Sequence, residues 1–132
     1  MGHVEEFLRA LVTSEQLCPF GQLRIFLDED IRCPEKYTAL RSLYFIHNNS
    51  KNVQIWDLHG HKYLPLTGKE VYIGSIEHFG TKEKLKFPTE IFLESEGFMR
   101  TRWSIGHTIF DLVNIHLFHD ASNFIAMEDV FY

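Results

Sequence analysis

Apolar and polar residues follow two different periods along this chain, and the change of period separates one predicted helix from a series of predicted strands. Near the start, the apolar residues have the i, i+3, i+4, i+7 spacing of an amphipathic helix: Val4, Phe7, Leu8 and Leu11. Thr13 and Ser14 follow, which predicts that the helix ends there. The later apolar runs are typical of β-strands and lie at 22–27, 37–47, 53–58, 63–66, 70–73, 98–105 and 108–118.

Short turn-forming segments separate these predicted strands. His59-Gly60-His61 predicts a hairpin, and the middle of the chain is then expected to form a meander. Gly106-His107 predicts a second, tight hairpin between the last two predicted strands. With 132 residues, of which 45% are hydrophobic and 14% aromatic, the chain can form one small globular domain. The pattern therefore predicts a single α+β unit rich in antiparallel strands.

The last predicted strand carries two polar side chains in an otherwise apolar run. Period-two alternation places Asn114 and His116 on one face, and Val113 and Ile115 on the other. Polar groups near the end of a rigid strand are a common position for catalytic side chains. On spacing alone, a core asparagine and histidine satisfied by backbone groups is the more frequent explanation. Both interpretations stay open at this point.

The charge of the chain restricts its ligands. A net charge of −5 argues against non-specific binding of nucleic acid, which depends on basic surface. An anionic small ligand would need a local basic site. Lys82, Lys84 and Lys86 alternate, so an extended segment would place three ammonium groups on one side. A solvated strand edge or loop, protected from pairing by its lysines, is the more frequent cause of this pattern.

Two arginines provide a second group of positive charges. Arg100 and Arg102 share one face of the predicted strand at 98–105, and the hairpin sets this strand beside the one that carries His116. Their guanidinium groups would reach either a substrate phosphate or the carboxylate of Asp111. An ion pair or a solvated face is the more frequent role for such arginines.

Cysteine content and hydropathy predict an intracellular chain. Cys18 and Cys33 are too few for a disulfide scaffold, so reduced thiols are expected. No run reaches the roughly 18 apolar residues of a membrane span, and the start lacks the order of charges and apolar residues typical of a signal peptide. We therefore expect a cytoplasmic protein.

The strand with Asn114 and His116 lies within a stretch that resembles a known family. Residues 114–119 read Asn-Ile-His-Leu-Phe-His and are similar to the Asn-Ser-His-Leu-Ala-Ala-His signature of the inositol polyphosphate 5-phosphatases, above all their type I branch. The resemblance covers most of the chain, clearly at 97–103 and 110–123, and more weakly at 84–88, 68–72, 44–47, 37–40 and 3–4.

The resemblance implies a fold and roles for the candidate residues. In that family a two-sheet sandwich flanked by helices holds a magnesium-dependent site at one end of its strands. By resemblance, the catalytic pair is His116, which would donate to the scissile phosphate, and its neighbour Asn114. Arg100, Arg102 and Lys86 would bind phosphate groups of the substrate.

Several motifs of the family have no counterpart in this sequence. Absent are the metal-binding Glu after the second strand, the Gly-Asp-x-Asn segment with the water-activating Asp, the Pro-x-Trp-Cys-Asp-Arg segment and the late Asp-His pair. We therefore expect residues 1–132 to form a single partial catalytic domain that lacks the first strands and the C-terminal half of the sandwich. Magnesium would be the cofactor of the complete enzyme, and this chain is expected to contribute no metal ligand.

Two functions of different classes follow from these expectations. The first is hydrolysis of the 5-phosphate of inositol 1,4,5-trisphosphate by the complete enzyme, which ends a calcium signal, in the cytoplasm or at the inner face of the plasma membrane through peripheral association. The second is a catalytically inactive product that binds a phosphoinositide or a protein through exposed sheet edges. Neither function requires nucleic acid or a transmembrane segment.

Overall fold

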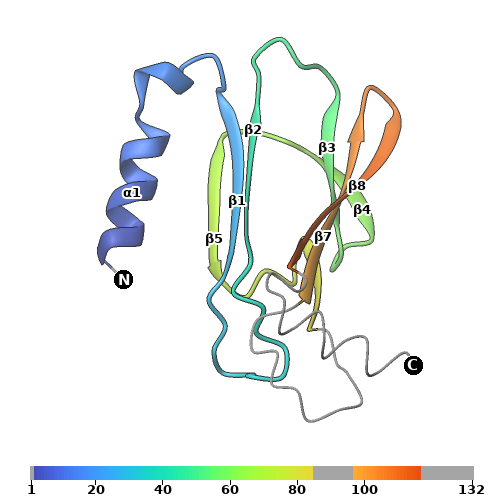
Figure 1. Ribbon diagram of the computed structural model, residues 1–132. Helices are drawn as coiled ribbons and strands as arrows, with labels where there is room; N and C mark the ends of the chain where they lie inside the picture. Colours follow the sequence, from blue (N-terminus) through green and yellow to red (C-terminus); the bar gives the residue numbers. More distant parts are fainter. Residues whose placement is uncertain (1, 85–96, 117–132) are drawn as a thin grey trace, which may run out of the picture.

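The computed structural model describes residues 2–84 and 97–116 (Figure 1). Its elements, in chain order, are α1 (Gly2–Val12), the 3-10 helix η1 (Glu15–Leu17), β1 (Gln22–Asp28), β2 (Arg41–Ile46), β3 (Val53–Asp57), β4 (Lys62–Pro65), β5 (Lys69–Gly74), β6 (Gly80–Lys84), β7 (Gly97–Ile105) and β8 (Thr108–His116). The predicted helix and strands are confirmed, although β2 is shorter than the run that predicted it. β6 is a strand that the hydrophobic pattern did not mark.

The strands form two sheets, which confirms a partial α+β sandwich. The first sheet has the order β2-β1-β5, and the second has the order β4-β3-β7-β6, with β8 paired to β7 along its whole length. β3 and β6 share the opposite edge of β7. The expected meander is wrong, because β5 pairs in parallel with β1 in the other sheet. The chain crosses between the sheets through Gly68, whose φ of +68° suits glycine.

β1 is the centre of the fold because both of its faces are covered. Its outer face packs against α1, through the buried residues Leu8, Leu23, Ile25 and Leu27. Its inner face contributes Phe26 to the core between the sheets, together with residues such as Ile55, Met99 and Trp103. This double burial explains why residues 23–27 include so few polar side chains. Phe7 was expected on the buried stripe of the helix, but it is 59% exposed.

The hairpin between β7 and β8 confirms the prediction from Gly106-His107. Both residues have positive φ angles, 55° and 71°, as in the type I′ turn that suits the twist of paired strands. The two-residue loop sets the register of the whole hairpin, from Ile105 opposite Thr108 to Gly97 opposite His116. Within the residues that the structure describes, no helix is long and apolar enough to cross a membrane.

The outer edge of β8 has no strand partner among the described residues. Ile109, Val113 and Ile115 are 50% to 60% exposed, and neither lysine nor proline interrupts the strand. Long apolar edges of this kind favour pairing with other chains. We therefore expect the purified 132-residue chain to enhance the fluorescence of a hydrophobic dye and to self-associate in size-exclusion chromatography.

Val113→Lys is the matched test of this edge, because it adds a charge to an exposed position of β8. The variant should bind less dye and elute later than the unmodified chain. An unmodified chain that is monomeric, melts cooperatively and binds no dye would contradict the expectation.

Candidate functional site at one end of the two sheets

The polar residues of β8 lie at the end of the sandwich where several strands begin or stop. β1 ends there at Asp28, β6 ends at Lys84, and β2 and β7 begin at Arg41 and Gly97 (Figure 1). Strands from both sheets therefore contribute backbone and side chains to the surroundings of Asn114 and His116.

Asn114 connects the two sheets. Its amide Nδ2 donates to the carbonyl oxygen of Arg41 at 2.9 Å and to Oγ of Ser42 at 3.2 Å. Arg41 and Ser42 begin β2 in the first sheet, whereas Asn114 belongs to the second. Asn114 thus makes the backbone hydrogen bond that the structural alternative expected, although the residue is only partly buried. These bonds place its side chain in a position to orient the end of β8.

His116 projects from the same face as Asn114, two residues further along β8. It lies opposite Gly97 of β7, and it is partly exposed. The alternation predicted from the sequence is therefore observed, and both side chains face the first sheet. A partly exposed imidazole at the end of a rigid strand has the placement that a donor to substrate needs.

A buried ion pair lies at the same end of the strands. Nζ of Lys82 is 2.7 Å from Oδ1 of Asp28, and the two side chains are 3% and 0% exposed. The other oxygen of Asp28 accepts hydrogen bonds from the backbone N–H and the hydroxyl of Thr38, at 2.8 and 2.7 Å. Lys82 and Lys84 do share one face of β6, which is an edge strand among the described residues. The side chain of Lys82 is nevertheless not solvated, because it is buried against Asp28.

The environment of Asp28 indicates how the stability of the protein should change in acid. Burial raises the pKa of its carboxyl, but the hydrogen bonds from Lys82 and Thr38 outweigh burial, so the pKa lies below its ordinary value of 3.8. A carboxyl whose pKa falls on folding stabilises the fold above about pH 4, and this contribution is lost as the pH falls through the folded-state pKa. As the pH falls from about 7 to about 3, we expect the free energy of unfolding of Asp28→Asn to decrease less than that of the wild type, as measured by urea unfolding. Parallel pH profiles for the two proteins would contradict this.

The two arginines lie on the opposite face from the candidate catalytic pair. Arg102 is the register partner of Asp111, and its Nε and Nη2 donate to the two carboxylate oxygens at 2.6 and 2.9 Å. This is the ion pair that the sequence offered as the alternative. Arg100 projects beside Arg102, so neither is brought together with His116. Lys86, the third predicted substrate ligand, lies outside the described residues.

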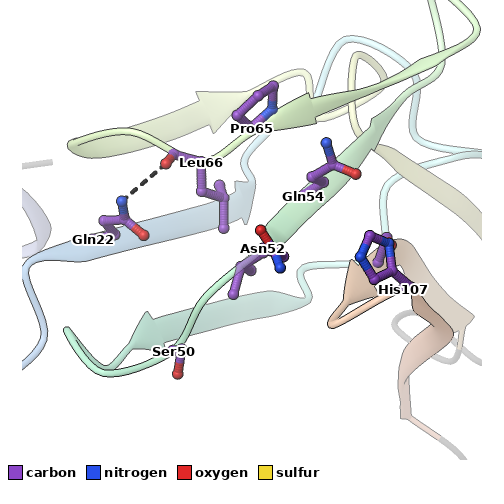
Figure 2. Close-up of a pocket in the computed structure, with 9 residues that line it drawn as sticks. Gln22, Ser50, Asn52, Gln54, Pro65, Leu66 and His107 are labelled. Carbon is purple, nitrogen blue, oxygen red and sulfur yellow. Dashed lines mark hydrogen bonds between the residues drawn. The ribbon is translucent and has the colours of Figure 1, made fainter.

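A pocket at the opposite end of the strands has a different chemistry. It has a volume of about 340 Å³, and Figure 2 shows Gln22, Asn52, Gln54 and His107 around it. Gln22 donates from Nε2 to the carbonyl oxygen of Leu66 at 2.9 Å. Among the residues that the structure describes, its lining includes no Asp, Glu, Lys or Arg. Because charged donors are the usual partners of phosphate, this pocket is poorly suited to a polyphosphate.

Comparison with curated proteins gives relatives along almost the whole chain. The chain is 45% identical over 132 residues to "Inositol polyphosphate-5-phosphatase A" of Rattus norvegicus and 44% identical to that of Homo sapiens, with 97% of this chain covered. It is 38% identical over 122 residues, 88% of its length, to the "Probable type I inositol 1,4,5-trisphosphate 5-phosphatase" of Caenorhabditis elegans. This chain is homologous to the inositol polyphosphate 5-phosphatases.

The 5-phosphatase homology covers only part of the relatives. The alignments include 32% of the rat and human proteins and 30% of the nematode protein, so the chain spans about a third of the length of the curated relatives it matches. No protein-family profile and no solved structure matches the chain. The relatives are named as inositol polyphosphate 5-phosphatases, which confirms the resemblance seen in the sequence.

Sequence reasoning missed the ion pair in this 5-phosphatase homologue. The sequence pattern assigned no role to Asp28, which follows the predicted strand at 22–27, and it marked Lys82 only as part of an alternating basic segment. A signal for Asp28 was present, because it directly follows a run that is buried on both faces. Its partner carried no signal, since 54 residues separate the two in the chain.

Proposed function

We propose that this chain is part of a magnesium-dependent 5-phosphatase that hydrolyses the 5-phosphate of inositol 1,4,5-trisphosphate in the cytoplasm. The observation that carries the proposal is the placement of Asn114 and His116 on one face at the end of β8, within the segment homologous to the named 5-phosphatases. The nematode relative is named for this substrate. Removal of the 5-phosphate would end a calcium signal, and peripheral association with the plasma membrane would bring the enzyme close to where the substrate forms.

In this reaction a water oxygen forms a bond to phosphorus, and the bond from phosphorus to the 5-oxygen of the ring breaks. Charge on the phosphoryl oxygens must be met by positioned donors. His116 would donate an N–H to such an oxygen, and Asn114 would orient the strand by its bonds to β2.

The described residues do not by themselves fit a magnesium site. Among residues 2–84 and 97–116 no group of three or more potential ligands is close enough to hold a metal ion. Asp28 lies near the site, but its oxygens are occupied by Lys82 and Thr38. We therefore assign the magnesium ligands of the proposed enzyme to residues outside this described part, and we derive no step through the ion.

The test is phosphate release by the complete protein that carries this sequence. With magnesium present, it should release one phosphate from inositol 1,4,5-trisphosphate and none from inositol 1,4-bisphosphate, which lacks the 5-phosphate. A chelator should abolish the release, and magnesium should restore it. Equal release from both compounds, or none from either, would contradict the proposal.

The second candidate function is a non-catalytic binding module. It is favoured by the exposed apolar edge of β8, which can add a strand from a protein partner. In that case the 132-residue chain would be a stable monomer that binds phosphoinositide vesicles or a peptide without releasing phosphate. The state of the purified 132-residue chain therefore separates the two candidates, because a partial domain should self-associate and bind hydrophobic dye, whereas a binding module should be a stable monomer.

A further inference from the structure

A single strand separates two side chains at the end of the second sheet. β6 and β8 pair with opposite edges of β7, and Gly97 is the register partner of both Lys84 and His116. Directly paired residues project from the same face of a sheet. Lys84 and His116 therefore project from one face, with Cα atoms two strand spacings apart, roughly 10 Å.

The strand between them carries no side chain at this position. A Cβ added to Gly97 would lie 2.6 Å from the carbonyl oxygen of Glu83 and 3.0 Å from Cγ2 of Thr38. Backbone cannot yield to such contacts, so a larger residue would not fit without a shift. The glycine lets the segment between β1 and β2, which contains Thr38, pack closely over the start of β7.

Lys84 is anchored to that same segment by a neutral group. Its Nζ donates to the carbonyl oxygen of Pro34 at 3.2 Å, and the residue is partly exposed. An ammonium group has three donors, so two remain after this bond. The carbonyl holds the side chain at the end of the sheet but does not neutralise its charge.

The other described cations near His116 are neutralised or face away. Lys82 shares the inner face of β6 with Lys84, but its charge is compensated by Asp28. Arg100 and Arg102 project from the outer face of β7, where Arg102 is paired with a carboxylate. At this end of the described inner face, the charge of Lys82 is thus compensated, whereas Lys84 bonds to a neutral carbonyl oxygen and forms no salt bridge there.

We propose that Lys84 binds a phosphate group of the inositol polyphosphate substrate, distinct from the group that reacts beside His116. This rests on the proposed function and adds a residue that determines substrate affinity. A phosphate away from the reacting atoms keeps its charge throughout the reaction, so Lys84 stabilises the bound substrate and the transition state equally. Losing the contact should raise KM and leave kcat nearly unchanged.

The experiment measures steady-state kinetics of the complete protein on inositol 1,4,5-trisphosphate. Lys84→Ala should raise KM by about 10- to 100-fold, the usual effect of losing a hydrogen bond to a charged group, with kcat within about threefold. Lys84→Arg should stay close to wild type. Lys84→Gln retains a donor for Pro34 and removes the charge, so it separates lost charge from lost anchoring. Lys51→Ala is the matched control, since Lys51 is an exposed lysine just before β3, near the opposite end of β7.

Three results would overturn the assignment of Lys84. They are an unchanged KM in Lys84→Ala, an equal rise in KM in Lys51→Ala, and a fall in kcat without a change in KM. In all three the wild-type protein still hydrolyses the substrate, so the proposed function survives. A wild-type protein that releases no phosphate would overturn both proposals. Thermal melting of each variant identifies any change caused by misfolding. If Lys84→Ala is misfolded, the KM values of Lys84→Gln and Lys84→Arg decide whether Lys84 binds substrate phosphate.

Discussion

Replacing His116 with alanine in the complete protein is expected to lower kcat by about 10²- to 10⁴-fold, the usual effect of losing a positioned donor or proton-transfer group. The side chain lies at the end of β8, partly exposed and on the face shared with Asn114. Its removal should affect the reaction far more than the fold, because a partly exposed side chain contributes little to packing. Initial rates of phosphate release and a thermal melt of the same samples measure the two effects.

His3→Ala is the matched control for this substitution, because His3 is an exposed histidine on α1. It should keep full activity. His116→Asn retains an N–H donor on a shorter side chain and should be less impaired than His116→Ala. A folded His116→Ala protein with more than about half of the wild-type activity would show that the role of His116 is structural and not catalytic.

Replacing Lys82 with methionine is expected to destabilise the protein by about 3–5 kcal/mol, because the carboxylate of Asp28 would stay buried without its cation. Native domains are stable by only about 5–15 kcal/mol, so this loss can unfold a large fraction of the molecules. Urea unfolding at neutral pH measures the change. The effect arises from burial, since both side chains are almost fully covered.

Two further variants test this explanation. Arg102→Ala breaks the ion pair with Asp111, whose side chains are 45% and 34% exposed, and should change stability much less than Lys82→Met. The double variant Asp28→Asn/Lys82→Met removes both charges and should recover part of the loss. Equal destabilisation by Arg102→Ala and Lys82→Met would show that burial of the pair is not the cause.

Local features of the fold were predictable from short stretches of residues. The helical spacing at 4–11 and the runs at 22–27 and 98–105 each identify an element, because the period of apolar residues reflects which face is buried. Gly106-His107 predicted a two-residue hairpin, and such a loop also implies the register of β7 and β8. The pairing of Arg102 with Asp111 follows from that register. The same register places the two arginines on one face of the sheet and Asn114 and His116 on the other.

The partners of the remaining strands were not predictable in this way. β5 has the same alternating pattern whether it continues a meander or pairs with β1, because periodicity identifies a strand but not its neighbour. β6 is a short strand with three charged residues, so it carried no hydrophobic signal at all. Its pairing with β7 is what brings Lys82 and Lys84 to the same end of the sheet as His116.

By itself, the sequence determined the family, the type of each main element and the two polar residues of β8, since these depend on neighbours in the chain. Only the tertiary structure decided which charges meet at the end of the sandwich. Asp28 and Lys82 form their ion pair although 54 residues separate them in the chain. Lys84 and His116 project from the same face on either side of Gly97, because their strands pair with opposite edges of β7. Contacts of this kind depend on strand order and sheet packing, which are properties of the whole chain rather than of any segment.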